Sequence, residues 1–170
     1  ASRVSPKVAV VYLMYTPEAS TNTQFGTGNP NDEAVYYRES DSAGVVWKPK
    51  VNITPYNRVT GPSYSPWVEA KGLYDSNDKL HIIYNATLIP TDPYGHLFAS
   101  WSAFVSGSSL FHWSNATNTI SRIYNAEWDT SVINDTAFCR WIGFNMLNLG
   151  GFGISECNGH LYVVWTMSTD

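Results

Sequence analysis

The chain has 170 residues and a mass of 19.0 kDa, enough for one domain, and its apolar fraction of 44% argues against an intrinsically disordered chain. Aromatic residues make up 15% of the chain and charged residues only 14%, a balance that favours strands over helices. The formal net charge of −4 argues against nucleic acid or an anionic membrane as partner, because either needs a basic surface. No apolar run approaches the roughly 20 residues of a membrane span.

Three short segments repeat along the chain and predict its first strands. Residues 7–12 (KVAVVY), 79–84 (KLHIIY) and 160–165 (HLYVVW) align without gaps at offsets of 72 and 81 residues. Self-similarity of this kind is typical of repeat architectures, in which one unit cannot bury its apolar faces alone. We therefore expect these three segments to be equivalent strands of successive units.

The second and third copies also match upstream, which predicts a hairpin in each. Residues 72–77 (GLYDSN) align with 153–158 (GISECN). The dipeptides Asn77-Asp78 and Asn158-Gly159 tolerate positive φ and are typical of tight hairpin turns. Each copy therefore predicts a strand A, a polar turn and a strand B.

A second pattern follows each B strand after a longer connection. In the first unit, residues 34–39 predict strand C, 40–47 (SDSAGVVW) a turn, and 51–54 the end of strand D. Seven residues separate the serine and the tryptophan of this turn, and the same spacing recurs between Ser106 and Trp113. The corresponding strand, turn and strand end of the next unit are expected at 97–102, 106–113 and 119–121.

The turn at 40–47 resembles the Asp-box of bacterial-neuraminidase-repeat, sialidase-like β-propellers. That box reads Ser-x-Asp-x-Gly-x-Thr-Trp. Ser40, Gly44 and Trp47 match it, while Ser42 and Val46 replace the aspartate and the threonine. The second turn keeps only its serine and tryptophan. The resemblance implies the propeller fold, and it does not imply sialidase chemistry, because the Asp-box is a structural turn remote from the family's active site.

The strands run in the order B-C-D, A-B-C-D, A-B, nine in all, with no helix expected. We predict an all-β chain, a single segment 1–170 of a β-propeller of four-stranded antiparallel blades, with units at about 1–60, 61–140 and an incomplete 141–170. Nine strands do not close a ring, so we expect another polypeptide or further sequence to complete it. The alternative is a β-sandwich of two sheets.

One carboxylate pair is compatible with catalysis. Glu127 and Asp129 would share a face of an extended segment roughly 7 Å apart, within the range of a glycosidase pair. A solvated loop in which Trp128 packs inward explains the same residues. The family resemblance implies three substrate-binding arginines, and no matching Arg-Ile-Pro segment occurs, so we do not expect an enzyme.

No metal or cofactor motif is recognised. The oxygen-rich residues 75–78 suit calcium, yet hairpin turns use the same residue types. The histidines are isolated in sequence and are expected to pack or to form hydrogen bonds. They are His81, His96, His112 and His160.

Aromatic residues near predicted strand ends or loops are the remaining candidates for a binding site. Flat rings beside asparagine and aspartate suit stacking on sugar rings, although the same rings also suit packing between units. The candidate ligand-binding residues are Trp67, Trp101, Trp128 and Trp141.

Sequons and cysteines predict an extracellular, secreted glycoprotein. The candidate glycosylation sites are Asn52, Asn85, Asn115 and Asn134. The two cysteines, Cys139 and Cys157, are expected to form a disulfide, with two free buried thiols as the alternative. We therefore expect a secreted, non-catalytic propeller segment for recognition or assembly, with a glycan as candidate ligand. The alternatives are part of a sialidase-like glycoside hydrolase and a structural subunit of an extracellular assembly.

Overall fold

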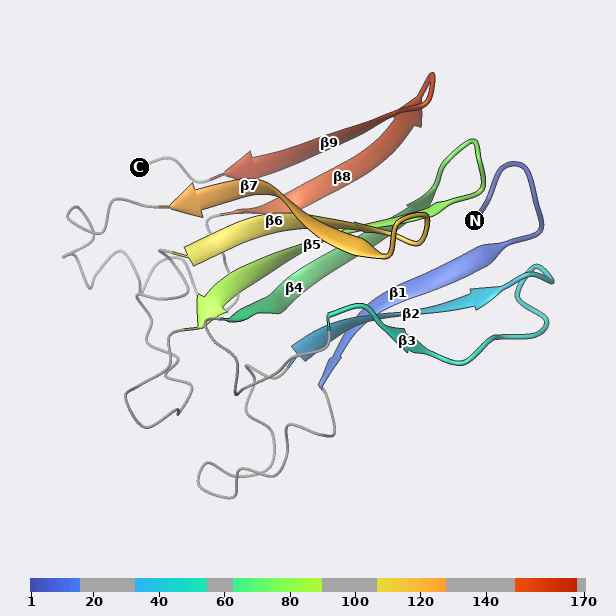
Figure 1. The fold of residues 1–170 in the computed structure, drawn as a ribbon, viewed down its shortest axis with the longest axis horizontal. Helices are drawn as coiled ribbons and strands as arrows, with labels where there is room; N and C mark the ends of the chain where they lie inside the picture. The colour runs from blue at the N-terminus through green and yellow to red at the C-terminus, as the bar shows by residue number, and fades with distance from the viewer. Residues whose placement is uncertain (16–32, 55–62, 90–106, 128–148, 168–170) are drawn as a thin grey trace.

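The structure, a computed structural model, describes residues 1–15, 33–54, 63–89, 107–127 and 149–167 (Figure 1). These residues form antiparallel strands and contain no helix, so the predicted all-β class is confirmed. The strands are β1 (Val8–Tyr15), β2 (Glu33–Ser40), β3 (Val51–Asn52), β4 (Ser63–Tyr74), β5 (Leu80–Ile89), β6 (Gly107–Ser114), β7 (Thr119–Glu127), β8 (Leu149–Cys157) and β9 (His160–Met167).

The strands form three sheets in chain order. The first sheet is β1-β2-β3, the second β4-β5-β6-β7, and the third β8-β9. Three, four and two strands are what the predicted order B-C-D, A-B-C-D, A-B requires, whereas a two-sheet sandwich needs only two sheets. The three repeated segments lie in β1, β5 and β9, the B position of each sheet.

The second sheet corrects the position of one predicted turn. The segment 106–113, predicted to be a turn and the start of strand D, is instead strand β6, which begins at Gly107 and places Leu110 and Trp113 in the core. The strand C predicted at 97–102 lies outside the described residues. The turn follows Ser114, where Asn118 adopts a φ of 51°. Ser114 is therefore the counterpart of Ser40, because each serine ends a C strand and its Oγ accepts a backbone N–H of the following turn.

The turn after β2 has the hydrogen bonds that its sequence suggests. Ser40 Oγ accepts the N–H groups of Ser42 and Gly44, and Ser42 Oγ accepts that of Val46. Gly44 has a φ of 90°, a conformation that side chains disfavour. Two serine hydroxyls therefore satisfy three turn donors, with Ser42 at the position where an Asp-box has its aspartate.

The two A-B hairpins differ by one residue in register. In the second sheet Asp75 N–H donates to Lys79 O, which leaves a three-residue loop ending at Asp78 with φ 62°. In the third sheet Asn158 and Gly159, with φ of 52° and 75°, form a two-residue loop. The gapless alignment of 72–77 with 153–158 is therefore wrong in structural register: Gly72 pairs with Ile82, but Ile154, not Gly153, pairs with the equivalent Val163.

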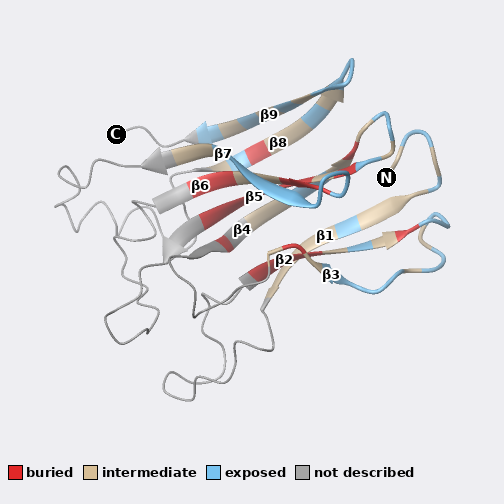
Figure 2. Cartoon of the chain, in the orientation of Figure 1, coloured by how far each residue is buried: buried red, intermediate tan, exposed pale blue. Residues whose placement is uncertain are grey.

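The second sheet is buried on both faces (Figure 2). On one face Ile82 and Tyr84 pack with Val35 of the first sheet, and on the other Ile83 packs with Phe152 of the third. Successive residues of a strand point to opposite faces, so a strand buried on both sides reads as a continuous apolar run. The residues 80–84 (LHIIY) are such a run, interrupted only by His81.

The three sheets lie one above another, and their two ends differ (Figure 1). The short A-B turns and the turn after β2 lie at one end, called here the turn end. The other end has the strand ends that lead into 16–32, 55–62, 90–106 and 128–148, and is called the connection end.

Candidate functional site

An acid and two histidines form a hydrogen-bonded chain at the turn end. His81 Nδ1 lies 2.9 Å from His112 Nε2, and His81 Nε2 lies 3.3 Å from Asp75 Oδ2. The two imidazole rings stack with centroids 5.2 Å apart. The expected hydrogen-bonded role is confirmed for His81 and His112, which are isolated in sequence and are brought together by the pairing of β5 with β6.

The two end groups of this chain, His112 and Asp75, both have a pKa below the usual value. Burial, and next the neighbouring His81, lower the pKa of His112. Burial alone would raise the pKa of Asp75, but hydrogen bonds from Lys79 N–H, from His81 and from Asn77 N–H lower it below its usual value. Both ring nitrogens of His81 have hydrogen-bond partners in this chain, so neither is free to bind a ligand.

The aspartates weighed for calcium are also engaged. Asp75 Oδ1 accepts the N–H groups of Asn77 and Lys79. Asp78 forms an ion pair of 2.9 Å with Lys7 and accepts a hydrogen bond from Ser5 Oγ. The hydrogen bond from Lys7 is the main cause that lowers the pKa of Asp78 to about 2. Among the described residues no group of three or more acidic, histidine or cysteine side chains is arranged to hold a metal ion.

Further polar contacts join neighbouring sheets at this end. Tyr74 of β4 donates to Glu39 of β2 at 2.7 Å, and burial followed by that carboxylate raises the pKa of Tyr74. Lys48 pairs with the same Glu39 at 2.8 Å. Ser76 donates to Glu156 of β8 at 3.1 Å. The Tyr74–Glu39, Lys7–Asp78 and Ser76–Glu156 contacts therefore join neighbouring sheets, which is a structural role, while the Lys48–Glu39 pair lies within the first sheet.

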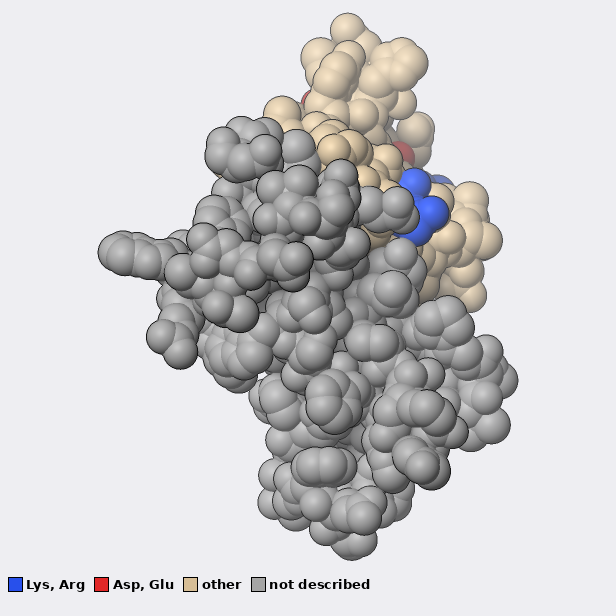
Figure 3. All heavy atoms as spheres, turned by 90° about the vertical axis from the view of Figure 1, so that its left-hand side faces the viewer, with Lys and Arg blue, Asp and Glu red and all other residues tan. Residues whose placement is uncertain are grey.

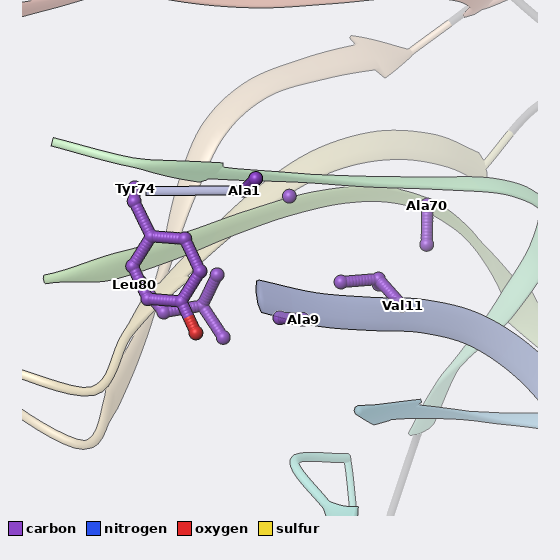
Figure 4. A pocket seen from close by; sticks show the side chains of 7 residues that line it. Ala1, Ala9, Val11, Ala70, Tyr74 and Leu80 are labelled. Carbon is purple, nitrogen blue, oxygen red and sulfur yellow. The ribbon is translucent and has the colours of Figure 1, made fainter. Parts of the chain in front are cut away.

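A small cavity lies between the first and second sheets (Figure 4). Its volume is about 140 Å³. Figure 4 shows Val11 and Ala9 of β1 on one side, and Tyr74 and Leu80 opposite. The hydroxyl of Tyr74 is already bonded to Glu39, and the other side chains that line the cavity are apolar. The full lining is Ala1, Ala9, Val11, Ala70, Gly72, Tyr74 and Leu80.

Of the four candidate ligand-binding tryptophans, only Trp67 lies within the residues that the structure describes. Trp67 lies in β4, near the strand end that follows 55–62. Trp128 directly follows β7, which ends here at Glu127. Trp101 and Trp141 lie outside the described residues, in the segments 90–106 and 128–148.

The carboxylate pair stays a prediction. The backbone of Glu127 pairs with Gly107 at the last position of β7, and Asp129 lies outside the described residues. Seen from the connection end, the visible described atoms include one small group of Lys and Arg atoms and few of Asp or Glu (Figure 3). This view shows no extended basic surface on the described part of that face.

The described sequons differ in environment. Asn85 is only 2% exposed and its Oδ1 accepts Glu69 N–H, so the folded sheet leaves no room for a glycan there. Asn52 donates to Tyr36 and accepts Thr54 N–H. Asn115 is exposed in the turn after β6, with its Oδ1 bonded to Leu80 N–H. Asn134 lies outside the described residues.

The predicted disulfide has one described partner. Cys157, the last residue of β8, is exposed and carries a free thiol. Cys139 lies outside the described residues, and because the thiol of Cys157 is free in the structure, the predicted Cys139–Cys157 disulfide is not borne out.

Comparison with known proteins returned no relative: no family model, no curated protein and no solved structure matches the chain. Within the described ranges, no helix is long and apolar enough to cross a membrane.

Proposed function

We propose that this chain is a non-catalytic segment of a β-propeller with sialidase-like blades, and that its connection end binds carbohydrate. The three sheets are the blades, with strand A present in the second and third. The bonded groups of the turn end hold the blades together, and the connection end carries the residues that meet the ligand.

Two features support the propeller part of the proposal. The B strands of the repeat lie in three separate sheets that stack face to face, as repeated four-stranded units do around an axis. The turn after β2 uses Ser40 and Ser42 to bind its own N–H groups at the positions that an Asp-box conserves.

The recognition part rests on residue type and on one described position: Trp67 lies in β4 near the strand end that follows 55–62, while Trp101, Trp128 and Trp141 lie outside the described residues. Loops on a rigid scaffold are the usual position of binding residues. At the opposite end the described acids and histidines bond to one another, which leaves that end little to offer a ligand. Aromatic rings flanked by polar residues suit the apolar faces and hydroxyl groups of sugars.

A glycan array combined with hydrolysis assays on fluorogenic glycosides tests this function. We expect binding without turnover, and we expect Trp101→Ala and Trp128→Ala each to weaken binding at least tenfold. The matched control is Trp47→Ala at the turn end, which removes a tryptophan from the same chain and should leave glycan binding unchanged. The absence of any glycan binding would overturn the proposal.

Hydrolysis of a fluorogenic glycoside would instead support the alternative function, part of a sialidase-like glycoside hydrolase. In that case Glu127→Gln should abolish hydrolysis while leaving binding in place, because the amide keeps the shape of the side chain and removes its acid–base function.

A further inference from the structure

The repeat assigns each B strand the same forward face, defined here as the face toward the next sheet along the chain. In β1 this face contains Val11, which packs in the core between the first and second sheets. The equivalent residue of β5 is Ile83, which is 0% exposed against the third sheet. In β9 the equivalent residue is Val164, which is 68% exposed, and its neighbour on the same face, Tyr162, is 54% exposed.

The rear faces show the converse arrangement. Ile82 of β5 is buried against the first sheet, and the equivalent Val163 of β9 packs in the core against the second. The equivalent residue of β1 is Val10, which is 49% exposed. The stack therefore ends in one uncovered forward face, on the third sheet, and one uncovered rear face, on the first.

The A strand of the third sheet lets another backbone approach closely. Gly153 pairs with Val164 and Ser155 pairs with Tyr162, so the forward face of β8 has no side chain larger than serine at these positions. A strand that lacks side chains on one face often marks a site where another chain packs closely. The side chains of Tyr162 and Val164 in β9 lie beside these two small residues of β8.

We propose that the forward face of the third sheet binds the rear face of the first sheet of a second copy of this chain. The contact continues an interface that already occurs twice within the chain, between the first and second and between the second and third sheets. Each copy has both halves of the interface, so two copies of the chain can form this contact with each other. The contact is head-to-tail, and repeated association gives a ring or an open chain of copies.

This inference rests on the stacked units of the proposed function and is independent of glycan binding. A chain that associates in this way and binds no glycan would overturn only the recognition part. A chain that binds glycan as a monomer would overturn only the association.

The test is sedimentation velocity of the full chain over a range of concentrations, with Val164→Glu on the forward face and Val10→Glu on the rear face. We expect the unmodified chain to form species above 19.0 kDa, and each variant alone to associate at least tenfold more weakly. Mixed together, the two variants should form a pair and nothing larger, because each retains one intact face and the two intact faces are complementary.

Val45→Glu is the matched control, because Val45 is an exposed valine in the turn after β2 and lies in neither β1 nor β9, the two strands that contain the face residues. It should associate like the unmodified chain, and circular dichroism should show all three variants folded. Tyr162→Glu provides a second forward-face variant. A chain that stays monomeric, or association that Val164→Glu and Tyr162→Glu leave unchanged, contradicts the proposal. A mixture of the two face variants that forms no pair also contradicts it.

Discussion

Strands β5 and β9 share one repeat and differ in what surrounds them. Ile83 in β5 is completely buried, whereas Val164, its equivalent in β9, is exposed. The residue types and the local strand are alike, so the difference arises from the sheets on either side. The second sheet has a neighbour on each face, and the third sheet has only one.

This difference shows where the stability of the molecule is generated. Apolar side chains stabilise the fold where a neighbouring sheet removes them from water, and not through the strand alone. The largest mutational effects are therefore expected at the contacts between sheets, and the smallest on the two uncovered faces.

The largest effect is expected at the buried member of the pair. Ile83→Ala should lower the free energy of unfolding by about 3 kcal/mol, because the cavity lies between two packed sheets. Val164→Ala should change it by less than about 0.5 kcal/mol in dilute solution. Urea denaturation of the monomer measures both, and equal effects would refute the contrast between the two strands.

A smaller effect is expected at Gly72, where the absence of a side chain lets the first sheet pack closely against the second. A Cβ built on Gly72 would lie 2.7 Å from Val11 Cγ2 of β1, whereas one on Gly150 would meet nothing within 4 Å. Gly72→Ala should therefore cost about 2 kcal/mol, and Gly150→Ala close to nothing. Adding Val11→Ala to the first variant should recover part of the loss, and a double-mutant cycle measures that coupling.

The turn after β2 should respond less than the sheet contacts. Ser40→Ala removes the acceptor of two backbone N–H groups and should cost about 1–2 kcal/mol. Ser114→Ala at the equivalent position removes the acceptor of only one and should cost less. Thermal unfolding of both variants tests the order, and the reverse order would show that the two serines are not equivalent.

The smallest effect is expected from pH. The pKa of His112 is lowered in the folded state, so the unfolded chain binds the proton more tightly. Stability should be fully present above the ordinary histidine pKa of about 6.5 and should fall as the pH drops through the folded-state pKa. His112→Gln should flatten this slope in urea midpoints measured between pH 5 and pH 8, and an unchanged slope would assign it to another group.

The sequence predicted the strands well because their signals are local. Alternation, the repeat and the turn residues at Asn158-Gly159 each act within a few residues, and they predicted the strand order, although strand C of the second unit was expected at 97–102 and Gly107–Ser114 forms it. The misplaced turn at 106–113 has a physical cause. A serine-to-tryptophan spacing does not distinguish a turn from a strand that places Leu110 and Trp113 in the core.

Local sequence patterns could not predict contacts between residues that lie far apart in the chain. The pairing of His81 with His112 depends on the register of β5 against β6, and the one-residue difference between the hairpins depends on loop length. The burial of Asn85 follows from the neighbouring sheets, which a three-residue sequon does not report. The candidate tryptophans were chosen by residue type, and only Trp67 lies within the described strands.

The face-to-face stacking of the sheets is tested most directly by one NOESY spectrum of the full chain with labelled methyl groups. We expect contacts from the Val11 methyl groups to the Hα protons of Gly72, and from the Ile83 methyl groups to the ring of Phe152. Backbone contacts that pair β3 with β4, or β7 with β8, and the absence of both methyl contacts would show one continuous sheet and contradict the stack.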